Sequence, residues 1–545
     1  MRASGFLLCV LVAVSARAQT NRYMVFFKDK AGTPFSVLQP QSYLSAKAIT
    51  RRNHGGIAVT AEDLPVNPAY VAQVKATGAK VFFTSRWFNG VLVEASPSLI
   101  NTIAALPMVS KAEYVAPGHK LAGGRVASQA ATASTTSSKY GSLLQFEMAG
   151  VDVMQEEDQI RGKGVMISVF DAGFPGINTG VLAFGPVVNE GRILMTRDFV
   201  GNSGNVYQYD NHGTVVFSVI GAKQGTWLCK TNCGEYSYIG AAPEAYFNLF
   251  VTEDNDTEYR IEEYNWAFAA EQADSAGTDV INSSLTYATF DDPSMNYKVS
   301  DLDGKTAVVS RAAAMARDRG IVVVVSAGND GLKPWHFIRF PSDVDGILSV
   351  GEVNSFGERG ALSSVGPTAD GRIKPDVMAM GVNSTAILPN GQPTLFSGTS
   401  FAAPIVAGVA AGLIQAFPEL KPAEIVAVIK ASASQAVNPD NEYGYGIASY
   451  VGSRNYLKSK FIEPDVVVYP NPVKDYYHLA FRNLPDGPVS FNLFDMAGRM
   501  VTDHSLTLTW SQNPLEIYAV NLFPGSYILR VVAGGKTYTL RLMKV

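Results

Sequence analysis

The sequence predicts a chain of the α/β class, built around a large domain with a parallel sheet that is buried on both faces. Nearly continuous apolar runs occupy residues 164–170, 279–282 and 320–325, and each is typical of a strand without a solvent-facing side. Helix-compatible segments, residues 259–272 and 305–319, lie between these runs. Apolar strands joined by crossover helices form parallel sheets, and ligand sites in such sheets lie beyond the carboxyl ends of the strands.

The first 18 residues have the pattern of a secretory signal peptide. Arg2 supplies the positive charge, residues 6–14 are a short apolar stretch, and Ala16-Arg17-Ala18 is a small-residue cleavage site. No run in the chain reaches the roughly 18 apolar residues that a membrane span needs. We therefore expect export and no transmembrane segment.

A smaller α+β domain is predicted between this signal and the parallel-sheet domain. Residues 19–120 hold strands and helices in the order β-α-β-β-α-β, which is the order of a ferredoxin-like domain. The predicted elements are strands at 23–27, 80–84, 90–94 and 109–115, and helices at 68–78 and 98–106. Residues 121–139 follow, rich in Ala, Ser, Thr and Gly, and they are expected to form an exposed linker where processing takes place.

The end of the chain is predicted to be a small β-sandwich at residues 466–545, after a linker at 458–465. Short alternating strands are separated by turn signals such as Asp495-Met496-Ala497-Gly498. The predicted strands are 477–481, 489–494, 526–532 and 536–542.

Charge and cysteine content exclude some functions. A formal net charge of −4 gives no electrostatic case for binding nucleic acid or an anionic membrane. Of the three cysteines, Cys9 lies in the signal, and Cys229 and Cys233 remain in the exported chain. In an oxidising compartment we expect these two to form one short-loop disulfide. No second Cys/His pair accompanies them, so a metal site is not expected there.

One stretch has the features of a nucleophilic site. Ser397-Gly398-Thr399-Ser400-Phe401-Ala402-Ala403-Pro404 leads into the apolar residues 405–414, so Ser400 is expected at the start of a buried helix with Pro404 in or near its first turn. A helix start offers free N–H groups and a positive dipole end to a developing oxyanion. The alternative is a serine that only caps a buried helix.

Three weaker motifs lie where the sheet model expects a site. Asp171 follows the strand at 164–170, His212 stands at the start of an apolar segment, and Asn329 comes just after the strand at 320–325. Taken singly, each has an ordinary structural explanation as a turn residue or a helix start.

Together, the order Asp171, His212, Asn329, Ser400 resembles that of the subtilisin-like serine proteases, the subtilase family. Further matching segments are Ile281-Asn282-Ser283-Ser284-Leu285, Gly371-Arg372-Ile373-Lys374-Pro375-Asp376-Val377 and Tyr443-Gly444-Tyr445-Gly446-Ile447. The resemblance covers about residues 140–456, and it implies a subtilisin-like three-layer domain at 140–457.

The resemblance also implies a reaction: hydrolysis of peptide bonds by a secreted serine endopeptidase that forms an acyl-enzyme. Ser400 would be the nucleophile, His212 the general base and then acid, and Asp171 the residue that orients the imidazole. Asn329 and the Ser400 N–H would form the oxyanion hole. The substrate would lie as an added strand between two edges, made of Ser284, Leu285 and Thr286 on one side and Ser326, Ala327 and Gly328 on the other.

Four residues depart from the family pattern, of which Ala172 and Phe174, near Asp171, are the milder changes. Thr286 stands where the family has Gly, and Met380 stands where it has Pro. A β-branched side chain at Thr286 can crowd an entering peptide. The competing hypothesis is therefore a catalytically silent binding or adhesive protein on the same fold.

The flanking domains have matching interpretations. Residues 19–120 have the position and element order of a subtilase propeptide, which acts as chaperone and inhibitor; a permanent accessory domain is the alternative. The C-terminal domain resembles the sorting domains of the type IX secretion system in residues 469–473, 494–499, 522–529 and 544–545; a generic binding β-sandwich is the alternative. Expected partners are polypeptide substrates, the propeptide itself and that secretion machinery, and the expected location is the exterior or surface of a Gram-negative bacterium.

No cofactor is expected. Glu253, Asp254 and Asp256 either bind a structural calcium ion or form a solvated acidic loop, and the sequence does not identify a calcium site.

Overall fold

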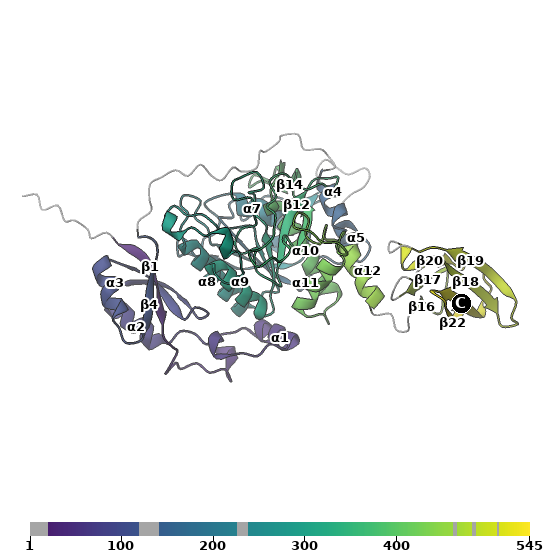
Figure 1. Ribbon diagram of the computed structural model, residues 1–545, viewed down its shortest axis with the longest axis horizontal. Coiled ribbons are helices and arrows are strands. Elements are labelled where there is room, and N and C mark those ends of the chain that lie inside the picture. The colour runs from purple at the N-terminus through teal and green to yellow at the C-terminus, as the bar shows by residue number, and fades with distance from the viewer. Residues whose placement is uncertain are drawn as a thin grey trace, which may run out of the picture.

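The computed structural model describes residues 20–118, 141–225, 238–460, 466–481, 485, 487–508 and 512–545 (Figure 1). The predicted signal peptide and the linker at 121–139 lie outside these residues. So do Cys229 and Cys233, for which the disulfide was expected.

The central domain is built on a seven-stranded parallel sheet, as the apolar runs predict. The strand order is β13-β12-β11-β10-β5-β9-β6, and every neighbouring pair is parallel. The strands are β5 (Met166–Asp171), β6 (Ile193–Asp198), β9 (Tyr246–Val251), β10 (Val280–Ser283), β11 (Val322–Ser326), β12 (Leu348–Val353) and β13 (Val377–Met380). The α/β fold class is thereby confirmed.

Helices cover both faces of this sheet and give the domain three layers (Figure 1). α7 (His212–Gly221) and α10 (Thr399–Ala416) pack on one face, and α8 (Ile261–Ala276) and α9 (Val308–Asp318) pack on the other. Successive strand residues alternate between the two cores, since side chains of a strand point to opposite faces. In β11, for example, Val322 and Val324 enter the α10 core, while Val323 and Val325 enter the α8 core.

Smaller elements complete the central domain: α4 (Gly141–Met148), α5 (Val151–Glu156), α6 (Gly185–Asn189), α11 (Pro422–Ala431), α12 (Tyr450–Lys460), and the strand pairs β7 (Lys223–Gln224) with β8 (Tyr238–Ile239) and β14 (Ser384–Ile387) with β15 (Pro393–Phe396). Among the described helices, α10 alone is long and apolar enough to cross a membrane, and most of it is buried in the domain as a core helix.

The N-terminal domain is a four-stranded antiparallel sheet with the strand order β2-β3-β1-β4. Its elements are β1 (Asn21–Phe27), α1 (Ala46–Gly55), α2 (Pro68–Ala76), β2 (Lys80–Ser85), β3 (Gly90–Ala95), α3 (Pro97–Ala104) and β4 (Val109–Pro117). The β-α-β-β-α-β order is the predicted one, with α1 inserted between β1 and α2.

The face of this sheet that points away from α2 and α3 packs on the central domain. Phe26, Trp87 and Phe88 belong to the same buried apolar core as residues of α8 and α9. The guanidinium of Arg319 lies 4.8 Å from the Trp87 ring centroid and that of Arg311 lies 4.6 Å from Phe88. The two domains therefore share one continuous core.

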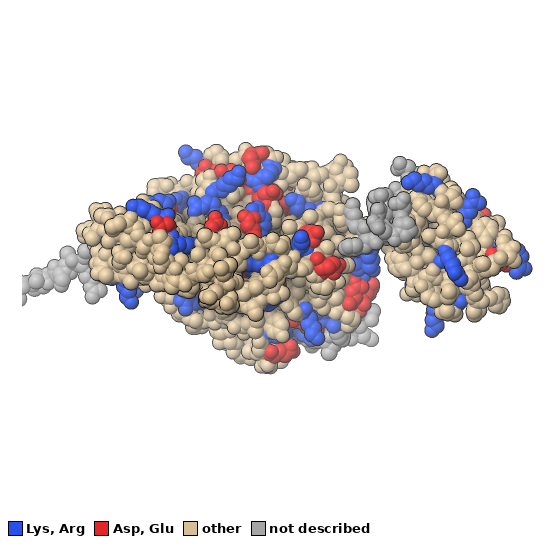
Figure 2. Space-filling model, turned by 90° about the horizontal axis from the view of Figure 1, so that it is seen from below, with Lys and Arg blue, Asp and Glu red and all other residues tan. Residues whose placement is uncertain are grey.

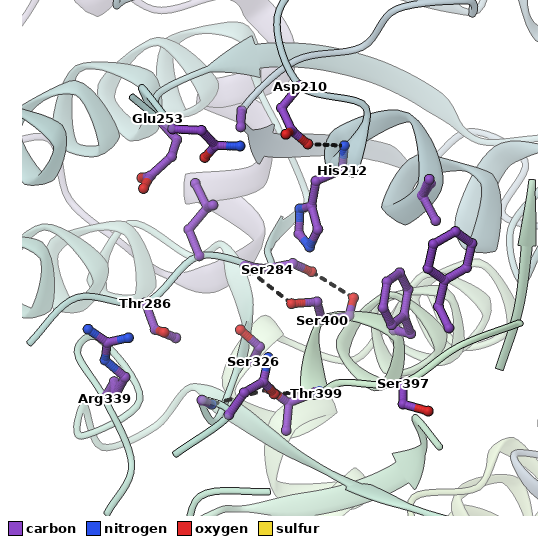
Figure 3. Close-up of a pocket in the computed structure, with 18 of the residues that line it drawn as sticks. Asp210, His212, Glu253, Ser284, Thr286, Ser326, Arg339, Ser397, Thr399 and Ser400 are labelled. Atoms are coloured by element: carbon purple, nitrogen blue, oxygen red, sulfur yellow. Dashed lines mark hydrogen bonds between the residues drawn. The ribbon is translucent and has the colours of Figure 1, made fainter. Parts of the chain in front are cut away.

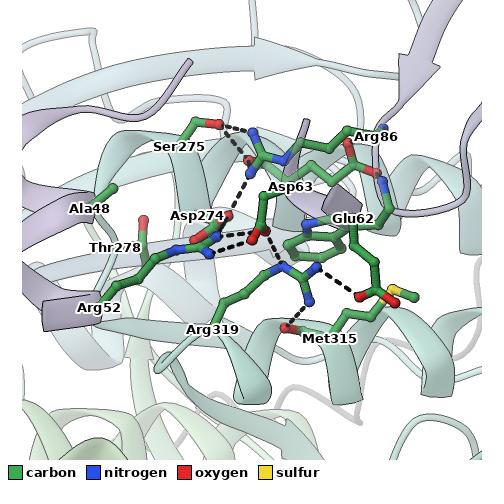
Figure 4. Close-up of polar contacts among 12 residues, drawn as sticks. Ala48, Arg52, Glu62, Asp63, Arg86, Asp274, Ser275, Thr278, Met315 and Arg319 are labelled. Atoms are coloured by element: carbon green, nitrogen blue, oxygen red, sulfur yellow. Dashed lines mark hydrogen bonds and ion pairs between the residues drawn. The ribbon is translucent and has the colours of Figure 1, made fainter. Parts of the chain in front are cut away.

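A buried ionic cluster lies beside this shared core (Figure 4). The carboxylate of Asp274, near the end of α8, is fully buried and pairs with three arginines of the N-terminal domain. The separations are 2.5 Å to Arg51, 2.7 Å to Arg52 and 2.5 Å to Arg86. Asp63 extends the cluster, because it pairs with Arg52 and with Arg319 of the central domain.

The C-terminal domain has two antiparallel sheets, β16-β17-β20 and β19-β18-β21-β22, around its own apolar core. Its strands are β16 (Val466–Tyr469), β17 (Tyr476–Phe481), β18 (Val489–Asp495), β19 (Met500–Leu506), β20 (Leu515–Tyr518), β21 (Gly525–Ala533) and β22 (Lys536–Lys544). On the face of the molecule seen in Figure 2, acidic and basic side chains are interspersed, in keeping with the small net charge.

Candidate active site

The start of α10 is shaped by two sequence features. Pro404 lies in the second turn of the helix, so it has no N–H to donate to the carbonyl of Ser400, four residues earlier. That carbonyl instead accepts a hydrogen bond of 2.9 Å from the Ser284 hydroxyl. Further along, a Cβ on Gly408 would lie 2.2 Å from that of Ala241, so glycine is needed for the close packing of α10. The helix start is thus tied to the edge that follows β10.

Asp171 and His212 meet where β5 ends and α7 begins. Asp171 is the last residue of β5 and is fully buried, and His212 is the first residue of α7. A Cβ on Gly213 would lie 2.8 Å from the Asp171 Cβ, so glycine lets the two elements touch. The imidazole Nδ1 lies 2.7 Å from Asp171 Oδ1, and the side chain of His212 keeps 29% of its surface exposed.

The protonation of His212 depends on this contact. Burial alone would lower the pKa of the imidazole, but the charge of Asp171 and the hydrogen bond to it raise that pKa above its usual value. The backbone N–H of His212 donates to the carboxylate of Asp210 at 2.7 Å (Figure 3), which fixes the start of α7.

Asn329 follows β11 and faces the start of α10. Its Oδ1 accepts hydrogen bonds from the backbone N–H and from the hydroxyl of Thr399, both at 2.9 Å. Since a backbone N–H can only donate, the atom it meets must be the amide oxygen. The amide NH₂ of Asn329 is therefore left as a donor within the described part of the chain, beside Gly398 and in the cleft that Ser400 also lines.

Ser400 and His212 line one cleft and point into the same space (Figure 3). Within the described residues, the Ser400 hydroxyl makes no hydrogen bond to His212. It donates instead to the carbonyl oxygen of Ser284 at 3.3 Å. The structure thus brings Asp171 and His212 into contact and holds Ser400 in the same cleft, turned toward the neighbouring edge.

The two predicted substrate edges border this cleft. Ser284, Leu285 and Thr286 line one side, and Ser326 and Gly328 line the other. Ala327 is fully buried behind them, where its N–H and carbonyl are bonded to neighbouring segments. In the part of the chain that the structure describes, the backbones of Leu285 and Thr286 form no hydrogen bonds, so this edge is open to an added strand.

The acidic residues Glu253, Asp254 and Asp256 do not form one cluster in the structure. Glu253 groups with Glu258 and Glu262, with carboxylate atoms within 4.8 Å of one another, and Asp254 and Asp256 are not part of this group. The Tyr287 hydroxyl donates a hydrogen bond of 3.0 Å to the Glu253 carboxylate.

Sequence reasoning missed two basic side chains of the cleft, Lys333 and Arg339. Neither belongs to a recognisable motif. Arg339 reaches the cleft because its segment pairs with the one that contains Tyr287, through an isolated antiparallel bridge between Tyr287 and Phe340.

Family models match three parts of the chain. The subtilase family matches residues 162–446, a peptidase S8 propeptide domain of Bacteroidota matches 22–134, and a secretion system C-terminal sorting domain matches 467–545. The last two matches indicate a secreted or cell-surface protein of a Gram-negative bacterium.

Individual relatives share about 30% of their aligned residues with this chain, or fewer. Subtilisin NAT of Bacillus subtilis subsp. natto is 30% identical over 292 residues, which is 52% of this chain and 64% of that protein, or less than two thirds of its length. Serine protease AprX of Bacillus subtilis is 29% identical over 324 residues, covering 54% of this chain and 67% of that one. Among solved structures, MycP1 from Mycobacterium smegmatis aligns with a TM-score of 0.45 and 22% identity over 59% of this chain and 87% of its own.

The subtilase match extends over more than half of the 545 residues and contains Asp171, His212, Asn329 and Ser400. The chain belongs to the subtilase family.

Proposed function

We propose that this chain is a secreted serine endopeptidase, made as a zymogen, that hydrolyses peptide bonds through Ser400, His212 and Asp171. The observation that carries the proposal is the 2.7 Å contact between His212 Nδ1 and the buried Asp171 carboxylate, in a cleft that also holds Ser400. An ionised carboxylate at Nδ1 keeps the proton on that nitrogen. Nε2 is then unprotonated in the neutral imidazole and free to act as a base.

The first half of the reaction forms the acyl-enzyme. Rotation about the Ser400 Cα–Cβ bond moves Oγ from the Ser284 carbonyl toward His212, and triad hydrogen bonds often tighten only when substrate binds. Oγ attacks the substrate carbonyl carbon while its proton passes to His212 Nε2. The carbonyl oxygen takes up negative charge, and the Asn329 amide and the Ser400 N–H donate to it.

The second half regenerates the enzyme. His212 gives its proton to the amine, the C–N bond breaks, and the amine leaves. A water molecule then attacks the ester carbonyl, loses a proton to His212 and releases the carboxylic acid, while Ser400 recovers its proton. No metal or cofactor is proposed for either half.

The flanking domains have proposed roles as well. The shared core and the buried cluster around Asp274 support the N-terminal domain as an intramolecular chaperone and inhibitor. Polypeptides are the proposed substrates, and the C-terminal domain is proposed to engage the type IX secretion machinery.

Replacement of Ser400 by alanine tests the proposed activity. The variant should lose hydrolysis of an internally quenched peptide library, whereas the matched control Ser397→Ala, on the same loop, should lose less than about tenfold. If the first cut is autocatalytic, the Ser400→Ala precursor should also keep its N-terminal domain attached. Equal hydrolysis by Ser400→Ala and the wild type would contradict the proposal. Absence of hydrolysis in the wild type would favour the catalytically silent binding protein.

A further inference from the structure

The cleft carries opposite charges at its two ends. In Figure 3, Arg339 lies on one side of the cleft, and Asp210 and Glu253 lie on the opposite side. Lys333 and Asp330 also line the cleft, and both cations pair with Asp330. This separation matters because the substrate has a fixed direction between the two edges. A charged substrate side chain is therefore attracted at one position and repelled at another.

Arg339 is held at the far wall of the space between the two edges. Its backbone N–H donates to the Ala327 carbonyl at 3.1 Å, which anchors it beside the end of β11. A Cβ on Gly328 would lie 3.2 Å from Arg339 Cγ, so the aliphatic part of the arginine packs on that glycine. Both Arg339 and Thr286 line the cleft, and they appear on the same side of it in Figure 3.

The guanidinium has donor capacity that the protein does not use. Among the described residues its side chain makes no hydrogen bond, its Nε is buried, and 18% of the side chain is exposed. The nearest acid is Asp330, at 3.5 Å from Nε, and Lys333 approaches that carboxylate more closely, at 2.9 Å. Arg339 and Lys333 together carry two positive charges and Asp330 carries one negative charge, so this group has one net positive charge.

The position of this charge relative to the reacting bond follows from the catalytic groups. For Ser400 to attack a substrate carbonyl, the carbonyl oxygen must lie at the Asn329 amide. The side chain of that same substrate residue then extends between the edges, past Thr286 and Gly328, toward Arg339. A planar guanidinium with open N–H groups matches a carboxylate, which it can bind through two parallel hydrogen bonds.

We propose that Arg339 makes this enzyme select substrates with an acidic residue, Glu or Asp, on the acyl side of the bond that is cut. The inference rests on the proposed function. It concerns one substrate position only, since the acidic side chains at the other end of the cleft give no advantage to acidic residues elsewhere in the peptide.

A pair of peptides that differ only by Glu or Gln at that residue provides the test. For the processed wild-type protein, kcat/KM should be about 10- to 100-fold higher for the Glu peptide, the scale of a charge-assisted bidentate contact. Arg339→Gln should bring the ratio close to one, and Arg339→Lys should retain part of it. The remote surface variant Arg317→Gln should leave the ratio unchanged. For each variant, a separate sample is labelled with a fluorophosphonate, which reacts with an activated serine, to count the folded and competent molecules.

The outcomes separate this inference from the proposed function. Cleavage of both peptides at equal rates, or a ratio that survives in Arg339→Gln, would overturn the role of Arg339 and leave the peptidase intact. Absence of any cleavage together with absence of labelling would overturn both.

The chain offers a second substrate for the same test. Residues 119–140 contain no Asp or Glu. A peptide of this sequence, added in trans, should therefore be cut at least about tenfold more slowly than the Glu peptide by the processed enzyme. Equally fast cleavage of the two would contradict the inference.

Discussion

Replacement of Asp171 by asparagine should lower kcat for peptide hydrolysis by about 10⁴-fold, the scale known for loss of the triad aspartate in serine proteases. The amide can present its NH₂ to His212 Nδ1, which moves the ring proton to Nε2 and removes the base that Ser400 needs. The buried carboxylate also stabilises the imidazolium that forms during the reaction, and the amide carries no charge to do so.

The pH profile of this variant gives a second readout. Activity requires neutral His212, so it rises as pH increases through the pKa of that residue. Asp171 raises that pKa, and its removal should move the acid limb of kcat/KM to lower pH. The neighbouring control Asp210→Asn, which touches the backbone of His212, should cost less than about tenfold. A variant Asp171→Asn that keeps wild-type kcat and an unchanged acid limb would show that Asp171 does not orient the base.

Replacement of Asp274 by alanine should destabilise the uncut precursor by about 3–5 kcal/mol. The substitution removes the buried carboxylate that pairs with Arg51, Arg52 and Arg86, and of these three Arg52 retains an ion pair with Asp63. Arg52, Arg86, Asp63 and Asp274 are labelled in Figure 4. The penalty arises from uncompensated charge. A variant in which an apolar group replaces each charged side chain of the cluster should therefore lose less free energy of unfolding.

Urea unfolding of the Ser400→Ala precursor, with and without the Asp274 substitution, measures this effect without self-cleavage. Lys47→Ala is the matched control, because Lys47 pairs with Asp279 across the same interface but keeps 38% of its side chain exposed. An exposed ion pair of this kind should contribute about 0–1 kcal/mol to the free energy of unfolding. Equal losses for Asp274→Ala and Lys47→Ala would indicate that the buried cluster does not hold the two domains together.

Local patterns explain which parts of the fold could be predicted. The strand at 164–170 and the helix after Ser400 are apolar without interruption, so the sequence specifies both their type and their burial. β9 was missed because Asn248 stands in its centre. In the fold, the NH₂ group of that residue donates to Ser168 and Thr278, and these two bonds offset part of the cost of burying a polar side chain.

The candidate site also contains residues that local patterns predict and residues that they do not. Asp171, His212, Asn329 and Ser400 stand in short motifs at strand ends and helix starts, so their proximity follows from the parallel sheet. Arg339 lies in no motif, and its place in the cleft depends on a bridge between segments that are distant in the sequence. The arginines around Asp274 are similarly contributed by α1 and by the turn after β2. No short sequence pattern predicts contacts between segments that are this far apart in the chain.

Reaction with a fluorophosphonate, followed by mass spectrometry of the modified peptide, tests most directly whether Ser400 is an activated nucleophile. We expect one covalent adduct, on Ser400, in the processed wild-type protein, and a much slower reaction in Asp171→Asn. An unreactive wild-type protein, or an adduct on another residue that persists in Ser400→Ala, would contradict the account.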